Sequence, residues 1–193
     1  NGGGYDDFVP QLVQSSGAQL DLVEVVQVAG AERTQMAETD AHQQDDADHR
    51  HEHGEYNEHV WYDLRAMQRL ADRIAERLAA ADPEGAAHYT ARADDFSAAV
   101  GELLVRIEGI AERHRGARVV ATEPLATHLI EAAGLIDATP AEFTQAVEED
   151  TEPPAATVAQ TLALFTGDPV QCLIMNTQTE TAATEQVPRA AHA

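Results

Sequence analysis

The fold is decided by residues 89–110, which read YTARADDFSAAVGELLVRIEGI. Apolar side chains recur along this stretch at the spacing of about 3.6 residues that defines one face of an α-helix. The predicted helix is far longer than the roughly ten to fourteen residues of an average one, and such helices often span two packing regions. Gly116 is expected to end it. The stripe consists of Tyr89, Ala93, Phe96, Val100, Leu103, Leu104, Ile107 and Ile110.

Short apolar runs and amphipathic stretches alternate on both sides of this helix. Strands separated by helices build parallel sheets, because a crossover must return the chain to the same edge. The order therefore predicts an α/β protein in which two parallel-sheet lobes are joined by one long, rigid helix. The predicted strands are residues 20–28, 118–121 and 170–175, and the predicted helices are residues 8–13, 64–78, 125–133 and 158–165.

Three parts follow from this pattern. Residues 1–82 are expected to form part of an N-terminal α/β lobe, residues 83–115 the helix between the lobes, and residues 116–193 part of a C-terminal α/β lobe. Residues 1–4 have the composition of a turn from a strand into a helix, and the sequence stops within an amphipathic pattern. We therefore expect a fragment that is incomplete at both termini. No signal-peptide pattern or long apolar run occurs in it.

The composition limits the class of partner. The formal net charge is -22, with 12 Lys and Arg against 34 Asp and Glu. Such a chain has no basic face for phosphates, so nucleic acid and anionic membranes are excluded as partners and cations are favoured. An acidic surface can also serve solubility alone. The one cysteine, Cys172, lies in an apolar run and is predicted to be a buried core residue, which leaves imidazole and carboxylate to hold any metal.

Residues 35–58 are nearly devoid of apolar side chains, and we call them the His-rich loop. A segment that cannot bury itself is predicted to be a mobile surface loop. Imidazole and carboxylate are ligands that zinc accepts without sulfur, and a flexible loop lets several of them meet one ion. The alternative is a solvated polar loop with no defined site. The histidines within it are His42, His49, His51 and His53.

Three residues next to predicted packed elements are separate candidates for metal ligands. His59 lies where the His-rich loop ends, and it could instead be an ordinary buried, hydrogen-bonded histidine. Glu123 follows a predicted strand, where open α/β sheets gather ligands, and it could instead cap the next helix. Glu180 follows the last predicted strand, and residues 177–179 before it are expected to satisfy nearby backbone groups.

Catalytic motifs are absent from the sequence. There is no Gly-x-Ser-x-Gly turn, no P-loop and no GxGxxG unit. Carboxylate pairs could be proposed almost anywhere in so acidic a chain, so they indicate nothing. The sequence favours a protein that is not an enzyme.

Four short segments resemble one family. Residues 57–64, NEHVWYDL, are similar to the PHVWLDP-type motif of zinc/manganese solute-binding proteins of ABC importers. Residues 1–8 resemble that family's Asn-Gly turn, residues 122–124 its third-ligand turn, and residues 176–179 its last-strand turn. The resemblance covers essentially the whole chain.

The resemblance implies a function and a location. It implies an extracytoplasmic protein, in the periplasm or anchored as a cell-surface lipoprotein, that acts as a monomer. Such a protein binds a divalent metal in a cleft between its lobes and delivers it to an ABC transporter permease.

The resemblance also implies which residues bind the metal. His59 matches the second ligand, Glu123 the third, and Glu180 falls near the fourth, while the first lies upstream of residue 1. Glutamate at the third position is typical of manganese-type members, whereas a His-rich loop is typical of zinc-type members. Zn²⁺ is favoured because several imidazoles suit it, and Mn²⁺ is the alternative.

Two other functions remain open from the sequence. One is a zinc-dependent hydrolase, in which an open coordination position would activate water. The other is a metal buffer that acts through the His-rich loop alone and holds several weakly bound ions. The coordination of the metal distinguishes the hydrolase from a binding protein, because a catalytic zinc keeps one position occupied by water.

Overall fold

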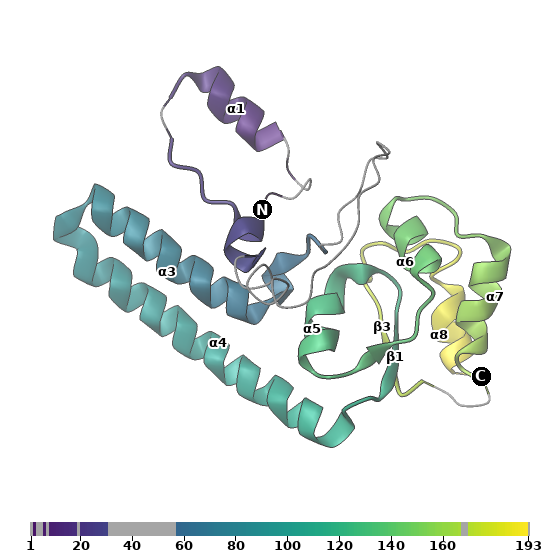
Figure 1. The fold of residues 1–193 in the computed structure, drawn as a ribbon. Helices are drawn as coiled ribbons and strands as arrows, with labels where there is room; N and C mark the ends of the chain where they lie inside the picture. The colour runs from purple at the N-terminus through teal and green to yellow at the C-terminus, as the bar shows by residue number, and fades with distance from the viewer. Residues whose placement is uncertain are drawn as a thin grey trace, which may run out of the picture. The chain divides into compact units, whose positions relative to one another are not determined.

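The computed structural model describes residues 2, 6, 8–18, 20–30, 57–166 and 170–192. The protein is mixed α/β and mostly helical, with a small parallel sheet and one long helix, α4 (Ala86–His114) (Figure 1). The chain divides into two compact units, Asn1–Leu103 and Leu104–Ala193. The division falls within α4, so the stripe that predicted the long helix belongs to both units. Gly116 follows α4 with a φ of +79°, which confirms it as the residue that ends the helix.

The first unit consists of helices in its described part. The helices predicted at residues 8–13 and 64–78 are confirmed. No strand occurs among the described residues of this unit, so a sheet in the N-terminal lobe stays a prediction. The elements are α1 (Phe8–Ser16), a helical segment at residues 25–30, the short 3-10 helices η1 (Val60–Tyr62) and η2 (Pro83–Gly85), α3 (Leu64–Ala81) and the first part of α4.

The predicted strand at residues 20–28 is wrong, because residues 25–30 are helical. Ala29 lies four residues after Val25 and three after Val26, so the three share one helical face, and they pack with Val60 and Ala66. Valine favours strands only weakly, and this packing overrides that preference.

A helical hairpin formed by α3 and α4 makes up most of the first unit (Figure 1). The Asp63 side chain begins α3 by accepting a hydrogen bond of 3.0 Å from the backbone N–H of Ala66. The side chain of Gln68 in α3 donates to the carbonyl of Ser97 in α4 at 2.8 Å. An apolar groove of about 390 Å³ lies along the hairpin. Its lining includes Met67, Leu70, Ile74, Leu78, Ala93 and Phe96.

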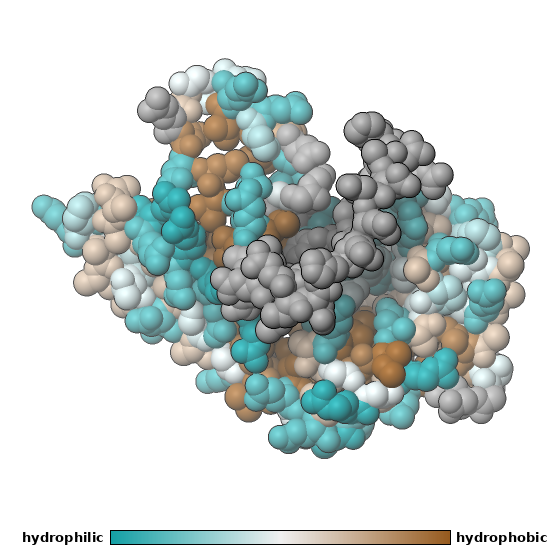
Figure 2. Space-filling model, viewed as in Figure 1, coloured by the Kyte–Doolittle hydropathy of each residue, from teal (hydrophilic) through white to brown (hydrophobic). Residues whose placement is uncertain are grey.

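Helix α1 keeps its apolar residues at the surface. Phe8 and Leu12 are both exposed, and no residue of the helix is buried. Figure 2 shows hydrophobic residues gathered where α1 lies in Figure 1. The helix therefore contributes little to the core of the first unit.

The second unit contains a three-stranded parallel sheet in the order β2-β1-β3. The predicted strand at residues 118–121 is confirmed in full, and the one at 170–175 is confirmed over three residues. The strands are β1 (Arg118–Ala121), β2 (Ile136–Asp137) and β3 (Cys172–Ile174). The helices are η3 (Pro124–Ala126), α5 (Thr127–Ala132), α6 (Ala141–Glu148), α7 (Ala155–Ala163) and α8 (Gln186–Ala191).

Residues of β1 alternate between two apolar clusters, as side chains of a strand must. Val119 packs with Ile130 of α5 on one face of the sheet. Val120 packs with Phe143 of α6 and Val187 of α8 on the other. Helices cover both faces of the small sheet, so β1 is its buried centre (Figure 1).

Cys172 is exposed, so the prediction of a buried core cysteine is wrong. It is the first residue of β3, and β3 forms one edge of the sheet. An apolar run therefore does not guarantee burial at the end of an edge strand. Most of the His-rich loop, residues 35–56, lies outside the described residues.

Candidate metal centre

His59 is the residue at which the chain enters the short helix η1. It precedes Val60, whose side chain is only 1% exposed and packs with Ala29 and Ala66. The backbone N–H of Tyr62 donates to the His59 carbonyl at 3.1 Å. The backbone position of His59 is therefore fixed by the turn and by the burial of its neighbour.

The His59 ring is held by two neighbouring side chains. Its Nδ1 lies 2.8 Å from Oδ1 of Asn57, and the same oxygen accepts the backbone N–H of His59 at 2.9 Å. The Trp61 ring meets the imidazole edge-on, with the two ring centroids 5.1 Å apart and the planes at 71°. Partial burial and these contacts give His59 the rigidity that a metal ligand requires.

Glu123 directly follows β1, the central strand of the sheet. It occupies the N-cap position of η3, yet its side chain makes no capping hydrogen bond. Its Oε1 instead accepts a hydrogen bond of 2.9 Å from the hydroxyl of Thr179. Glu123 therefore occupies the cap position, as the alternative expected, but its side chain is directed to Thr179 rather than to the backbone of the helix.

The turn after β3 supplies the partner of Glu123. Sequence reasoning expected residues 177–179 to satisfy nearby backbone groups, but Asn176 does this, since its Oδ1 accepts from the backbone N–H of Gln178 at 3.0 Å. Thr179 is then directed to the carboxylate of Glu123. The carboxyl ends of parallel strands meet at one edge of a sheet, which brings the two turns together, but the pairing itself depends on the register of β1 and β3.

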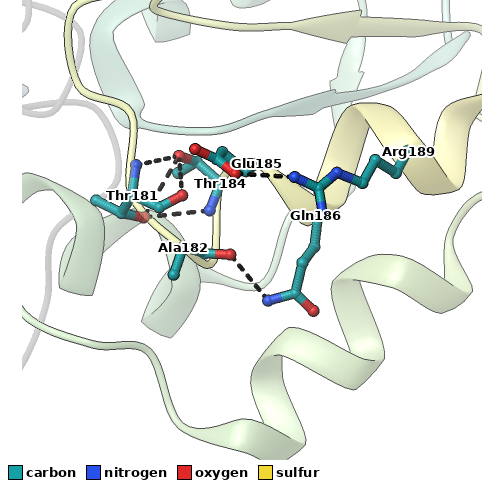
Figure 3. Close-up of polar contacts among 6 residues, drawn as sticks. All are labelled: Thr181, Ala182, Thr184, Glu185, Gln186 and Arg189. Atoms are coloured by element: carbon teal, nitrogen blue, oxygen red, sulfur yellow. Dashed lines mark hydrogen bonds and ion pairs between the residues drawn. The ribbon is translucent and has the colours of Figure 1, made fainter.

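Glu180 follows Thr179, and its side chain is exposed. The next turn is closed by reciprocal hydrogen bonds: the N–H of Thr181 donates to Oγ1 of Thr184 at 2.8 Å, and the N–H of Thr184 donates to Oγ1 of Thr181 at 3.2 Å (Figure 3). Thr184 is buried. The backbone that carries Glu180 is thus anchored at its following residues.

The end of β2 contributes a further polar cluster that sequence reasoning missed. The Thr139 hydroxyl accepts from the backbone N–H of Ala121 at 2.9 Å and donates to Oδ1 of Asp137 at 2.6 Å. These bonds brace the end of β1 two residues before Glu123. A two-residue strand is too short to show hydrophobic periodicity, so this cluster could not be predicted from sequence.

Within the part of the chain that the structure describes, no three His, Cys, Asp or Glu side chains are grouped so that they could hold a metal ion. His59 belongs to the first unit, whereas Glu123 and Glu180 belong to the second. His42, His49, His51 and His53 lie outside the described residues. The donor types of the three candidates, one imidazole and two carboxylates, fit a divalent transition metal.

None of the described helices is both long and apolar enough to cross a membrane. No curated protein sequence matches the chain significantly. The family described as zinc-uptake complex component A, periplasmic (ZnuA), matches residues 1–193, which confirms the resemblance carried by residues 57–64. Proteins of this family are extracytoplasmic substrate-binding components of metal uptake rather than enzymes. The chain belongs to the periplasmic zinc-uptake component A (ZnuA) family over all of its 193 residues.

Proposed function

We propose that this protein captures a divalent transition metal ion, Zn²⁺ in preference to Mn²⁺, and delivers it to an ABC importer in the membrane. The observation that carries the proposal is the position of Glu123. Its carboxylate stands at the carboxyl end of the central strand and is bound by Thr179 rather than by the helix that follows it. Family membership over residues 1–193 supplies the biological context.

The proposed ligands are His59 and Glu123, with Glu180 as a further carboxylate. Support for His59 comes from its fixed backbone and oriented ring, because an ordered imidazole loses little freedom when it binds a metal. Support for Glu180 comes from its place after β3 and from the hydrogen-bonded turn at residues 181–184 that follows it. We propose that His59 and Glu123 bind the same ion.

Capture and release need no chemical step. A binding protein fills the coordination positions of its metal with protein ligands, and the ion then leaves when the importer separates those ligands. In the division that we propose, residues 1–82 and 116–193 belong to the two lobes and residues 83–115 form the helix between them. The protein is proposed to act as a monomer, in the periplasm or as a cell-surface lipoprotein.

The His-rich loop is proposed to be an auxiliary collector. His42, His49, His51 and His53 stand among several carboxylates, and the whole chain carries a formal charge of -22. A strongly negative protein raises the local concentration of cations. Weak binding in the loop would therefore supply ions to the tight site without forming part of it.

Elemental analysis together with calorimetry on the native protein tests this function. One tightly bound Zn²⁺ per chain, with weaker binding of Mn²⁺, is the expected result. Several weak ions and no tight one would favour the metal buffer instead. Hydrolytic activity that requires the bound zinc would favour the hydrolase.

A further inference from the structure

The segment from Asn57 to His59 forms a compact turn held by one oxygen. Oδ1 of Asn57 lies 2.9 Å from the backbone nitrogen of His59 and 2.8 Å from its ring Nδ1. Both distances are those of good hydrogen bonds. A single side-chain oxygen thus links the backbone and the ring of the same histidine.

The directions of these two bonds follow from their chemistry. A backbone N–H can only donate, so the Asn57 atom that it faces is the carbonyl oxygen rather than the amide nitrogen. A carbonyl oxygen can only accept, so Nδ1 of His59 must carry the hydrogen in the second bond. In the neutral imidazole the lone pair then resides on Nε2.

The ring has little freedom to abandon this arrangement. Trp61 contacts it edge-on, and the burial of Val60 fixes the backbone on its carboxyl side. Asp63, which caps α3, donates its backbone N–H to the Val60 carbonyl at 2.9 Å. His59 is therefore separated only by the short helix η1 and by Asp63 from the start of α3, a regular helix of 18 residues.

We infer that Asn57 is a positioning residue that sets the tautomer of His59, so that Nε2 presents its lone pair to the metal. In water the neutral histidine ring favours the opposite tautomer, with the hydrogen on Nε2. Without Asn57, metal binding through Nε2 would first have to reverse that preference. This inference rests on the proposed function, in which His59 is a ligand, and it assigns the coordinating atom.

Nitrogen-15 NMR of the metal-free native protein tests the tautomer directly. In alkaline buffer, where imidazole rings are neutral, the His59 Nδ1 signal is expected in the range of a protonated nitrogen and the Nε2 signal in the range of a bare one. The chain has nine histidines, so the signals are assigned by their loss in His59→Gln. A bare Nδ1 in the native protein would overturn the inference.

Three substitutions separate this role from a merely structural one. Asn57→Asp keeps an oxygen acceptor at the same place, so the tautomer and the Zn²⁺ affinity should remain close to native. Asn57→Ala removes the acceptor and should lower the affinity by about 10- to 100-fold, the usual effect of losing a residue that orients a ligand. Asn57→Ser can still accept the backbone N–H of His59 but is too short for the ring, so it should behave like Asn57→Ala.

The outcomes distinguish the inference from the proposed function. If His59→Gln leaves Zn²⁺ affinity unchanged, the proposed function fails at this ligand, whatever the tautomer. If His59→Gln weakens binding while Asn57→Ala and Asn57→Ser do not, the positioning role of Asn57 is refuted and the ligand assignment stands. If Asn57→Ala lowers the Zn²⁺ affinity but Asn57→Ser keeps the native affinity, only the backbone turn matters, which also contradicts the inference.

Discussion

The hydroxyl of Thr179 donates a hydrogen bond of 2.9 Å to Oε1 of Glu123, across 56 positions of sequence. It joins the turn after β3 to the end of β1, the strand beside it in the sheet. Because the bond involves a charged acceptor, it is among the stronger kinds of hydrogen bond. Thr179 thereby orients the carboxylate that we propose as a metal ligand.

Removal of this hydroxyl is expected to weaken metal binding. Thr179→Val keeps the branched shape and loses the donor, so the Glu123 carboxylate should lose its fixed orientation and Zn²⁺ affinity should fall by about 10- to 100-fold. Thr179→Ser keeps the donor and is the matched control. Calorimetric titration of both variants measures the effect, and equal affinities for the two would argue against an orienting role.

Deletion of residues 41–53 from the His-rich loop is expected to spare tight binding. Because this sequence has so few apolar residues, we expect its ions to be bound independently of the tight site. Calorimetry should show the tight event unchanged and the weak events reduced. Loss of all high-affinity binding on deletion would refute this separation.

The turn between α3 and α4 should give the first unit a measurable dependence on pH. The hydrogen bond of 2.8 Å from the Tyr89 hydroxyl, followed by one from the Gly85 backbone, holds the pKa of Asp82 below its ordinary value of 3.8. A lowered pKa in the folded state stabilises the protein above 3.8 and ceases to do so as the pH falls through the lowered value. The same bond raises the pKa of Tyr89 above 10.0, so its stabilisation is lost again in strong alkali.

Tyr89→Phe tests this pH dependence. The variant should melt at a lower temperature than the native protein at neutral pH, and the difference should shrink as the pH falls below 3.8 and Asp82 becomes protonated. Asp82 is exposed, so the effect is expected to be small. A difference in melting temperature that stays constant from neutral pH to pH 2 would show that the lost hydroxyl acts through something other than Asp82.

Sequence periodicity predicted those elements that are long or deeply buried. The apolar stripe from Tyr89 to Ile110 lies within α4, and the run at residues 118–121 is β1. Prediction from the sequence failed at residues 20–28. The valines there suggested a strand, but the segment is helical where Val25 and Ala29 pack against Val60. Composition alone also misplaced Cys172, because burial depends on a strand's place in the sheet.

The candidate site likewise contains residues that the sequence identified and residues that it did not. His59 and Glu123 were identified because they lie in segments that resemble motifs of the family and that stand next to packed elements. Their partners Asn57 and Thr179 were not identified, because a hydrogen bond depends on the turn geometry that brings two side chains together. The link from Thr179 to Glu123 became visible only once β1 and β3 were paired in a register.

Zn²⁺ affinity and metal-induced thermal stabilisation, measured in His59→Ala and Glu123→Ala, show whether these two residues bind the metal. Exposed residues of the same types provide matched controls, His88→Ala and Glu112→Ala. A metal that binds only the folded state stabilises it by about 4 kcal/mol at roughly a thousandfold excess over its dissociation constant. Each ligand substitution should lower the Zn²⁺ affinity by more than about 100-fold and remove most of that stabilisation, while the controls keep both. Native affinity and a native melting shift in both His59→Ala and Glu123→Ala would mean that neither residue binds the metal.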